Sequence, residues 1–83
     1  MISIVIPAFN EAQSLRLLIG ELNTVAIEES LDFEFILVDD GSSDGTWDII
    51  AQLAAEDHRI RGIRFRKNFG KAAALDAGFG AAR

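Results

Sequence analysis

Two adjacent aspartates, Asp39 and Asp40, end the apolar run in "FILVDDGSSDGTWDII", and a loop of Gly, Ser and Asp follows them. Carboxylates in such a loop suit three kinds of site: a calcium cage, a phospho-acceptor pocket that holds magnesium, and a clamp on a nucleotide. The three sites need different neighbouring residues, so the rest of the sequence can separate them.

A calcium loop of the EF-hand type accounts for only the first half of this segment. With Asp40 at the first position, Asp44 and Gly45 stand at the fifth and sixth positions, as the motif requires. The twelfth position must be a bidentate glutamate, and here it is Ala51. The pattern therefore argues against calcium.

A phospho-acceptor pocket would need a third aspartate at the end of a later strand. The next predicted strand, in "RIRGIRFRKN", is followed by Arg66 and Lys67 instead. The paired acids also follow the second predicted strand rather than the first. A nucleotide clamp is the interpretation that remains.

Three strands and three helices must position these residues. Apolar runs predict strands at 2–9, 33–40 and 59–65, the first buried on both faces and the third more exposed. Helical spacing of apolar residues predicts helices between the strands and a last helix from Lys71 onward. This β-α-β-α-β-α order predicts an α/β fold with a Rossmann-like parallel sheet.

Helix ends and glycines have local structural interpretations. We expect Asn10 to cap a helix that begins at Glu11, and Asp44 or Thr46 to cap the second helix. Gly20 is expected to permit a close approach of the first helix to the sheet. We expect Gly41 and Gly45 to form tight turns, Trp47 to pack in the core, and Arg59, Arg61 and Arg64 to lie on solvated strand faces.

Ligands of open α/β sheets bind at the carboxyl ends of the strands, where three loops would meet. The loops contain carboxylates that can accept a base N–H or a ribose hydroxyl, an aromatic ring that can cover a base, and cations that can meet phosphate. The dinucleotide fingerprint G-x-G-x-x-G is absent after the first strand.

Composition excludes several classes of protein. The 83 residues include no cysteine and one histidine, so a disulfide framework or a structural zinc site is not supported. No apolar stretch is long enough to span a bilayer, and the start of the chain lacks a basic leader, which predicts a cytoplasmic location. A helical pattern still runs at the last residues, so we expect the chain to be the front part of a longer protein.

Charge is distributed unevenly along the chain. Residues 1–58 contain 12 acidic residues and one basic residue, whereas residues 59–83 contain seven basic residues and one acidic residue. The basic part either complements the acidic part across solvated faces or supplies positive potential to a phosphorylated ligand. Because the chain as a whole is acidic, with a net charge of −5, nucleic acid is not an expected partner.

The segments "SIVIPAFNE", "FILVDDGSSDGTWDII" and "RKNFGKAAALDAGF" together resemble the N-terminal half of family 2 glycosyltransferases. The resemblance covers essentially the whole chain and is strongest to the branch that transfers sugars to polyprenyl phosphates, such as dolichyl-phosphate mannosyltransferases. It implies a GT-A fold whose first half, residues 1–83, binds a nucleotide-diphosphate sugar with a UDP or GDP moiety.

The resemblance implies a role for each motif residue. Pro7, Phe9 and Glu11 would contact base and ribose, Asp39 the base, and Asp40 the ribose or the neighbourhood of the metal. The full predicted set of nucleotide-binding residues is Pro7, Phe9, Glu11, Val38, Asp39, Asp40, Arg66, Asn68 and Lys71.

Two parts of the family pattern are missing. The D-x-D motif, which holds Mg²⁺ or Mn²⁺ on the diphosphate, and the catalytic base lie further along in the family, so no catalytic or metal residue is assigned here. The full enzyme would act on a polyprenyl phosphate at the cytoplasmic face of a membrane, and this part alone would not catalyse transfer. The alternative is a stand-alone nucleotide-binding or oligomerising α/β module. Separately, an uncovered edge strand predicts that the chain associates with itself.

Overall fold

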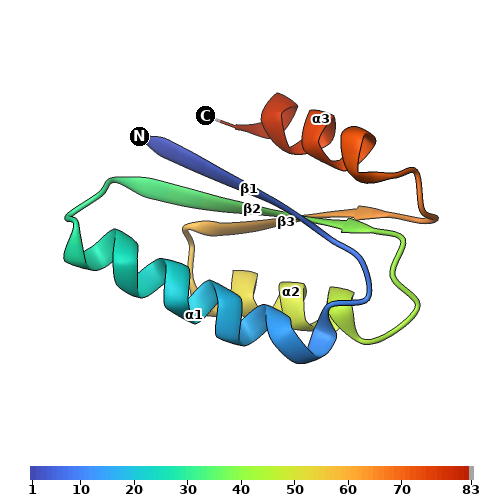
Figure 1. The fold of residues 1–83 in the computed structure, drawn as a ribbon, viewed down its shortest axis with the longest axis horizontal. Helices are drawn as coiled ribbons and strands as arrows, with labels where there is room; N and C mark the ends of the chain where they lie inside the picture. Colours follow the sequence, from blue (N-terminus) through green and yellow to red (C-terminus); the bar gives the residue numbers. More distant parts are fainter. Residues whose placement is uncertain (83) are drawn as a thin grey trace.

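The computed structural model of the chain describes residues 1–82. Three parallel strands form one sheet in the order β1-β2-β3, with a helix after each strand (Figure 1). The predicted α/β architecture is therefore confirmed. The elements are β1 (Ile2–Ala8), α1 (Ala12–Glu28), β2 (Phe33–Asp40), α2 (Thr46–Glu56), β3 (Ile60–Phe65) and α3 (Lys71–Ala81).

The central strand, β2, is buried along its whole length. Within residues 1–82, β1 lies at the sheet edge and pairs only with β2, with Ile2 opposite Phe33 and Ala8 opposite Asp39. The prediction that β1 is buried on both faces is confirmed in part. Ile4 and Ile6 pack against the core on one face and Val5 against the core on the other, but most of its residues are only half-buried because the strand lies at an open edge. β3 is the other edge and alternates between half-buried and exposed residues after Ile60, as predicted.

The helices cover both faces of the sheet. α1 and α2 lie on one face and α3 lies on the other (Figure 1). Alternate residues of β2 point to opposite faces, so Phe35 and Leu37 join the core beneath α1 and α2, whereas Ile36 and Val38 join the core beneath α3. Trp47 packs against the first of these cores, as predicted.

The first helix departs from two local predictions. It begins at Ala12, and Asn10 does not cap it but adopts a left-handed backbone with φ of 54°. Gly20 has open space where a Cβ atom would stand, so it allows no close approach to the sheet. Of the apolar residues at helical spacing in α1, Leu15 and Ile19 are buried, whereas Leu18 and Val25 on the flank are exposed.

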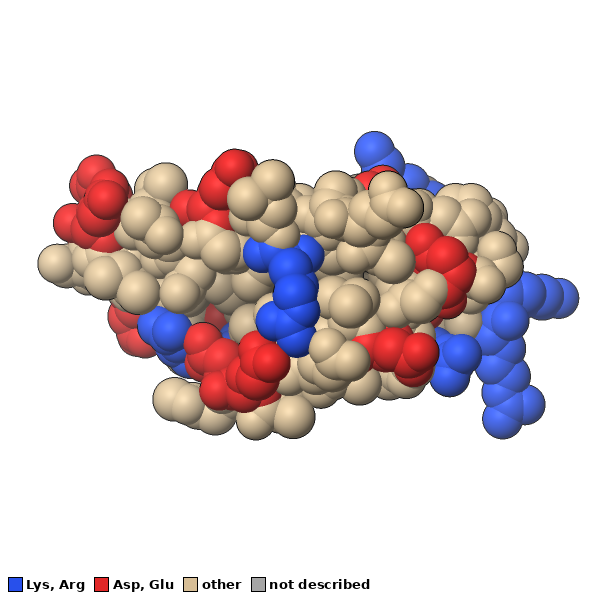
Figure 2. Space-filling view, turned by 90° about the horizontal axis from the view of Figure 1, so that it is seen from below, with Lys and Arg blue, Asp and Glu red and all other residues tan. Residues whose placement is uncertain are grey.

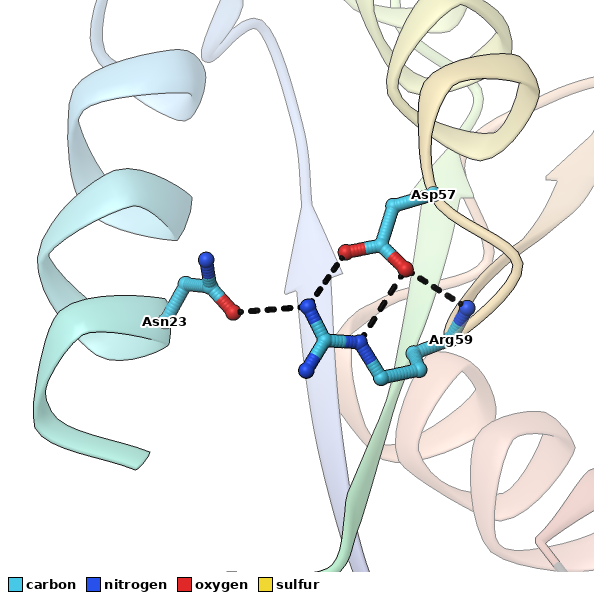
Figure 3. A network of polar contacts seen from close by, with 3 residues as sticks. All are labelled: Asn23, Asp57 and Arg59. Carbon is cyan, nitrogen blue, oxygen red and sulfur yellow. Dashed lines mark hydrogen bonds and ion pairs between the residues drawn. The ribbon is translucent and has the colours of Figure 1, made fainter. Parts of the chain in front are cut away.

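Arg59 and Arg61 are engaged in ion pairs rather than solvated on a strand face. Arg59 precedes β3, forms an ion pair with Asp57 at 2.8 Å, and also donates to the side chain of Asn23 on α1 (Figure 3). Arg61 forms an ion pair with Glu34 at 2.8 Å. The prediction for these two arginines was wrong because buried or half-buried carboxylates lie within their reach.

Candidate functional site at the carboxyl ends of the strands

Three loops follow the carboxyl ends of the strands and gather at one end of the molecule (Figure 1). We call residues 9–11 loop 1, residues 41–45 loop 2 and residues 66–70 loop 3. A cavity of about 190 Å³ opens among the end of β1, loop 1, the end of β2 and the start of α3. It is lined by Pro7, Ala8, Phe9, Glu11, Asp40 and Lys71.

Loops 1 and 2 are joined by hydrogen bonds between residues far apart in the sequence. The backbone N–H of Asn10 donates to Ser42 Oγ at 2.9 Å, and the backbone N–H of Ser43 donates to Asn10 Oδ1 at 2.9 Å. The Asn10 side chain therefore holds loop 2 instead of capping α1. This pairing fixes the positions of Phe9 and Glu11 on the cavity wall.

The side chains of Asp44 and Thr46 accept hydrogen bonds from backbone N–H groups at the amino ends of α1 and α2. Asp44 Oδ1 accepts from the backbone N–H of Thr46 at 2.9 Å, and Asp44 Oδ2 accepts from that of Ala12 at 3.3 Å. Thr46 Oγ accepts from the backbone N–H of Glu11 at 2.9 Å. The prediction that Asp44 or Thr46 occupies the N-cap of α2 was wrong, because Gly45 stands at that position; Asp44 instead accepts from the first N–H group of each helix. The hydrogen bond from the Thr46 side chain is the main cause that holds the pKa of Asp44 below its ordinary value.

Asp39 lies on the α1/α2 side of β2 and is fully buried. Its Oδ1 accepts from the backbone N–H of Ser42 at 2.9 Å. Its Oδ2 is buried and has no hydrogen-bond partner among residues 1–82. A buried carboxylate oxygen without a donor costs free energy, so it marks a place where a donor from a ligand would be favourable.

Asp40 lies on the opposite side of β2 and faces loop 3. Its Oδ1 accepts from the backbone N–H of Phe69 at 2.8 Å. Its Oδ2 accepts from the backbone N–H of Gly70 at 3.1 Å and from Asn68 Nδ2 at 3.2 Å. The carboxylate is therefore occupied by the protein itself, although Asp40 also lines the cavity.

The structure brings together five of the nine residues predicted to bind the nucleotide. Val38 is fully buried in the core beneath α3, and Asp39 lies behind the cavity rather than on its wall. Arg66 is exposed in loop 3, and Asn68 is bound to Asp40. The five residues on the cavity wall are Pro7, Phe9, Glu11, Asp40 and Lys71, and the wall also includes Ala8, which the sequence reasoning missed because a small apolar strand residue carries no chemical signal.

Positive charge gathers at the end of the molecule that carries the three loops. Figure 2 shows Lys and Arg side chains projecting from that end of the α1/α2 face, while over the rest of the face basic side chains lie among acidic ones. Arg66, Lys67 and Lys71 are exposed, and within residues 1–82 none of them has a carboxylate within ion-pair distance. Their positive potential is therefore available to an anionic ligand.

A larger cavity, of about 250 Å³, lies at the opposite ends of the strands and includes Arg59 and Arg61. Both arginines are neutralised there by Asp57 and Glu34. Volume alone therefore does not identify the site, and the smaller cavity carries the convergent chemical groups. The part of the chain that the structure describes contains no group of three or more His, Cys, Asp or Glu side chains placed to hold a metal ion.

The fold and the site define an open parallel α/β protein with a cavity at the carboxyl edge of its sheet. The sequence comparison is more specific, because residues 3–83 match the model of Glycosyl transferase family 2. The chain therefore belongs to glycosyltransferase family 2, as its three motifs predicted.

Similar proteins carry names from the polyprenyl-phosphate branch, which is the branch that the motifs indicated. An undecaprenyl-phosphate 4-deoxy-4-formamido-L-arabinose transferase of Aeromonas hydrophila subsp. hydrophila is 38% identical over 84 residues, covering 100% of this chain and 26% of that protein. A transferase of the same name from Photorhabdus laumondii subsp. laumondii is 39% identical over 79 residues, covering 94% of this chain and 24% of that protein. The chain thus spans about a quarter of the length of these relatives.

Proposed function

We propose that this chain is the donor-binding part of a glycosyltransferase that uses a nucleotide-diphosphate sugar. The observation that carries the proposal is the cavity at the carboxyl ends of the strands, which combines an aromatic ring, two carboxylates and an ammonium group. These groups match the parts of a nucleoside diphosphate, and the unpartnered Asp39 Oδ2, at the same end of β2 but on its other side, supplies one more acceptor.

Each side chain has a definite task in this proposal. Phe9, which is 45% exposed, covers a face of the base. Glu11 accepts from ribose hydroxyls, and the unpartnered Asp39 Oδ2 accepts an N–H of the base. Lys71 stands at the first residue of α3, where the helix dipole and its own ammonium group both favour phosphate.

The whole protein would then transfer the sugar to a polyprenyl phosphate at the cytoplasmic face of a membrane. The names of the similar proteins support this acceptor class. None of the helices within residues 1–82 is long and apolar enough to cross a membrane. A divalent cation, Mg²⁺ or Mn²⁺, would neutralise the diphosphate, but the described residues offer no set of ligands for it, so its ligands are proposed to come from outside this chain.

Calorimetric titration of UDP and GDP into the 83-residue chain tests the donor proposal. We expect one nucleotide to bind, and Asp39→Ala to weaken it by about tenfold or more because a hydrogen bond to a buried charged group is lost. Asp76→Ala, which removes an exposed carboxylate on α3, is the matched control and should leave the affinity unchanged. Absence of binding by both nucleotides, to a chain shown to be folded by circular dichroism, would contradict the proposal.

A further inference from the structure

We propose that Asp40 is a positioning residue, which holds loop 3 and thereby keeps Lys71, the first residue of α3, on the wall of the cavity. The inference rests on the proposed function, because it assigns Asp40 a role in the same donor site. It differs from the role that the family resemblance implied, a direct contact with ribose or with the surroundings of the metal.

The first observation is the direction of the hydrogen bonds. Three donors of loop 3 converge on the two carboxylate oxygens of Asp40: the backbone N–H groups of Phe69 and Gly70 and the side-chain amide of Asn68. The same amide also donates to the backbone oxygen of Asp40 at 3.2 Å. Within residues 1–82, all the hydrogen bonds between loop 3 and β2 that involve a side chain end on Asp40.

The second observation is the close approach of the two loop backbones. A Cβ atom at Gly41 would lie 2.2 Å from the carbonyl carbon of Lys67 and 2.4 Å from the backbone nitrogen of Asn68. Loop 3 therefore packs directly against the residue that follows Asp40. Its position depends on this contact and on the carboxylate together, independently of any ligand.

The position of loop 3 decides where the phosphate-facing groups lie. Gly70 turns the chain with φ of 97° directly before α3 begins at Lys71, and Gly70 is bound to Asp40. Release of Gly70 from the carboxylate would let the first turn of α3 and the Lys71 ammonium group move away from the cavity. Phe9 and Glu11 would stay in place, because loop 1 is held by loop 2 through Asn10 and Ser43.

A carboxylate is required for this role, since both of its oxygens accept hydrogen bonds. In Asp40→Asn, one oxygen becomes an NH₂ group that faces N–H donors of loop 3, and at least one of the hydrogen bonds is lost. Nearly all of the Asp40 side chain is buried, with 4% of its surface exposed, so water cannot replace the lost acceptor well.

Comparison of a nucleoside with its diphosphate separates positioning from direct contact. The affinities of uridine and guanosine, and of UDP and GDP, are measured by calorimetry for the original chain and for Asp40→Asn. We expect the diphosphate affinity to fall about tenfold or more, and the nucleoside affinity to change less than about twofold. An equal loss for nucleoside and diphosphate would assign Asp40 to the ribose and overturn the inference, as would an unchanged diphosphate affinity.

Hydrogen exchange provides a readout that needs no ligand. In Asp40→Asn we expect faster exchange of the Phe69 and Gly70 amides, with protection retained at Ile36 and Leu37 in the middle of β2. Unchanged exchange at Phe69 and Gly70 would overturn the inference even if nucleotide affinity fell. If the original chain binds neither nucleoside nor diphosphate, the proposed function fails while the exchange result still decides the role of Asp40.

Asn68→Ala provides the same test if Asp40→Asn does not fold. This variant keeps the carboxylate and removes only the Asn68 side-chain donor, so the core beneath β2 is untouched. We expect a smaller loss of diphosphate affinity than in Asp40→Asn, together with faster exchange at Phe69. Loss of affinity without any change in exchange would show that Asn68 contacts the ligand and that Asp40 does not act through it.

Discussion

Asp39 and Asp40 are neighbours in the chain, yet their carboxylates lie on opposite sides of β2. Within residues 1–82, Asp39 accepts a hydrogen bond from Ser42 in loop 2 and keeps one buried oxygen without a partner. Both carboxylate oxygens of Asp40 accept hydrogen bonds from loop 3. Strand geometry causes this division, because successive side chains of a strand point to opposite faces. The two acids therefore do not form the paired ligands that their spacing first suggested, and each has its own role.

The contact between loops 2 and 3 predicts that alanine substitution at two glycines of loop 2 will change the stability by very different amounts. Gly41→Ala should destabilise the chain by about 2 kcal/mol or more, because Gly41 has φ of 74° and an added Cβ would meet the backbone of loop 3. Gly45→Ala should change stability by less than about 1 kcal/mol, since Gly45 has φ of −84° and open space around it. Urea denaturation of the two variants checks this, and equal effects would contradict the structure. Gly45 is thus not required for a tight turn, contrary to the prediction.

The packing of α3 on the sheet predicts a second contrast between glycines. An added Cβ at Gly78 would lie 2.2 Å from Val5 Cγ1 on β1, and the β-branched Val5 has little freedom to move. Gly78→Ala should therefore destabilise the chain by about 1 kcal/mol or more, even after the gain in helix propensity. Gly80→Ala meets nothing within 4 Å and should be neutral or stabilising by up to about 1 kcal/mol. Thermal unfolding followed by circular dichroism distinguishes the two, and a stabilised Gly78→Ala would refute the close approach.

The ion pair between Asp57 and Arg59 predicts a pH-dependent part of the stability. The hydrogen bond from the Arg59 side chain is the main cause that holds the pKa of Asp57 below its ordinary value of 3.8. Because the folded-state pKa is lowered, the stabilisation is present above pH 3.8 and is lost as the pH falls through the folded-state pKa. Asp57→Asn should cost about 0.5–1 kcal/mol at neutral pH, since a partly exposed pair is screened by water.

Urea denaturation at neutral pH and at several pH values below 3.8 measures this effect. The difference between the original chain and Asp57→Asn should shrink as the solution becomes more acidic. Asp76→Asn, at an exposed position of α3, controls for the general effect of removing a negative charge. A difference that stays constant down to the most acidic pH would show that the ion pair does not stabilise the fold.

The open edge of the sheet predicts self-association of the chain. Within residues 1–82 no strand pairs with the outer side of β1, and the exposed side chains of Leu18 and Val25 lie on a flank of α1 that has no cover. Since the N–H of Ile2 donates toward β2, those of Ser3 and Val5 point outward and can pair with a second copy. Pro7, which lacks an N–H, limits that pairing to the first part of β1.

Sedimentation at increasing concentration should therefore show dimers or larger species. Val25→Lys places a charge on the uncovered flank and should shift the distribution toward monomer. Gln13→Lys adds the same charge at another exposed position of α1 and serves as the matched control. A chain that remains monomeric at high concentration would contradict the prediction.

The sequence alone determined the order of the elements, the parallel α/β class and the family. These features depend on short-range patterns: the apolar run of β2, the helical spacing of Leu15 and Ile19, and motifs whose residues are close in the chain. Such a pattern can be recognised from residues that are close together in the chain. The same patterns located the three loops at the end of the molecule that carries the site, because parallel strands bring their carboxyl ends to one edge.

Tertiary structure decided which side chains are free to bind a ligand and which hold the site together. Asn10 was expected to cap its own helix but binds Ser43, and Asp40 was expected at the ribose but holds residues 28 to 30 positions away. Local sequence could not show these pairings, since a polar side chain takes whichever partner the packing of distant segments brings within reach. The need for glycine at positions 41 and 78 has the same origin, because only the folded chain brings Lys67 and Val5 against them.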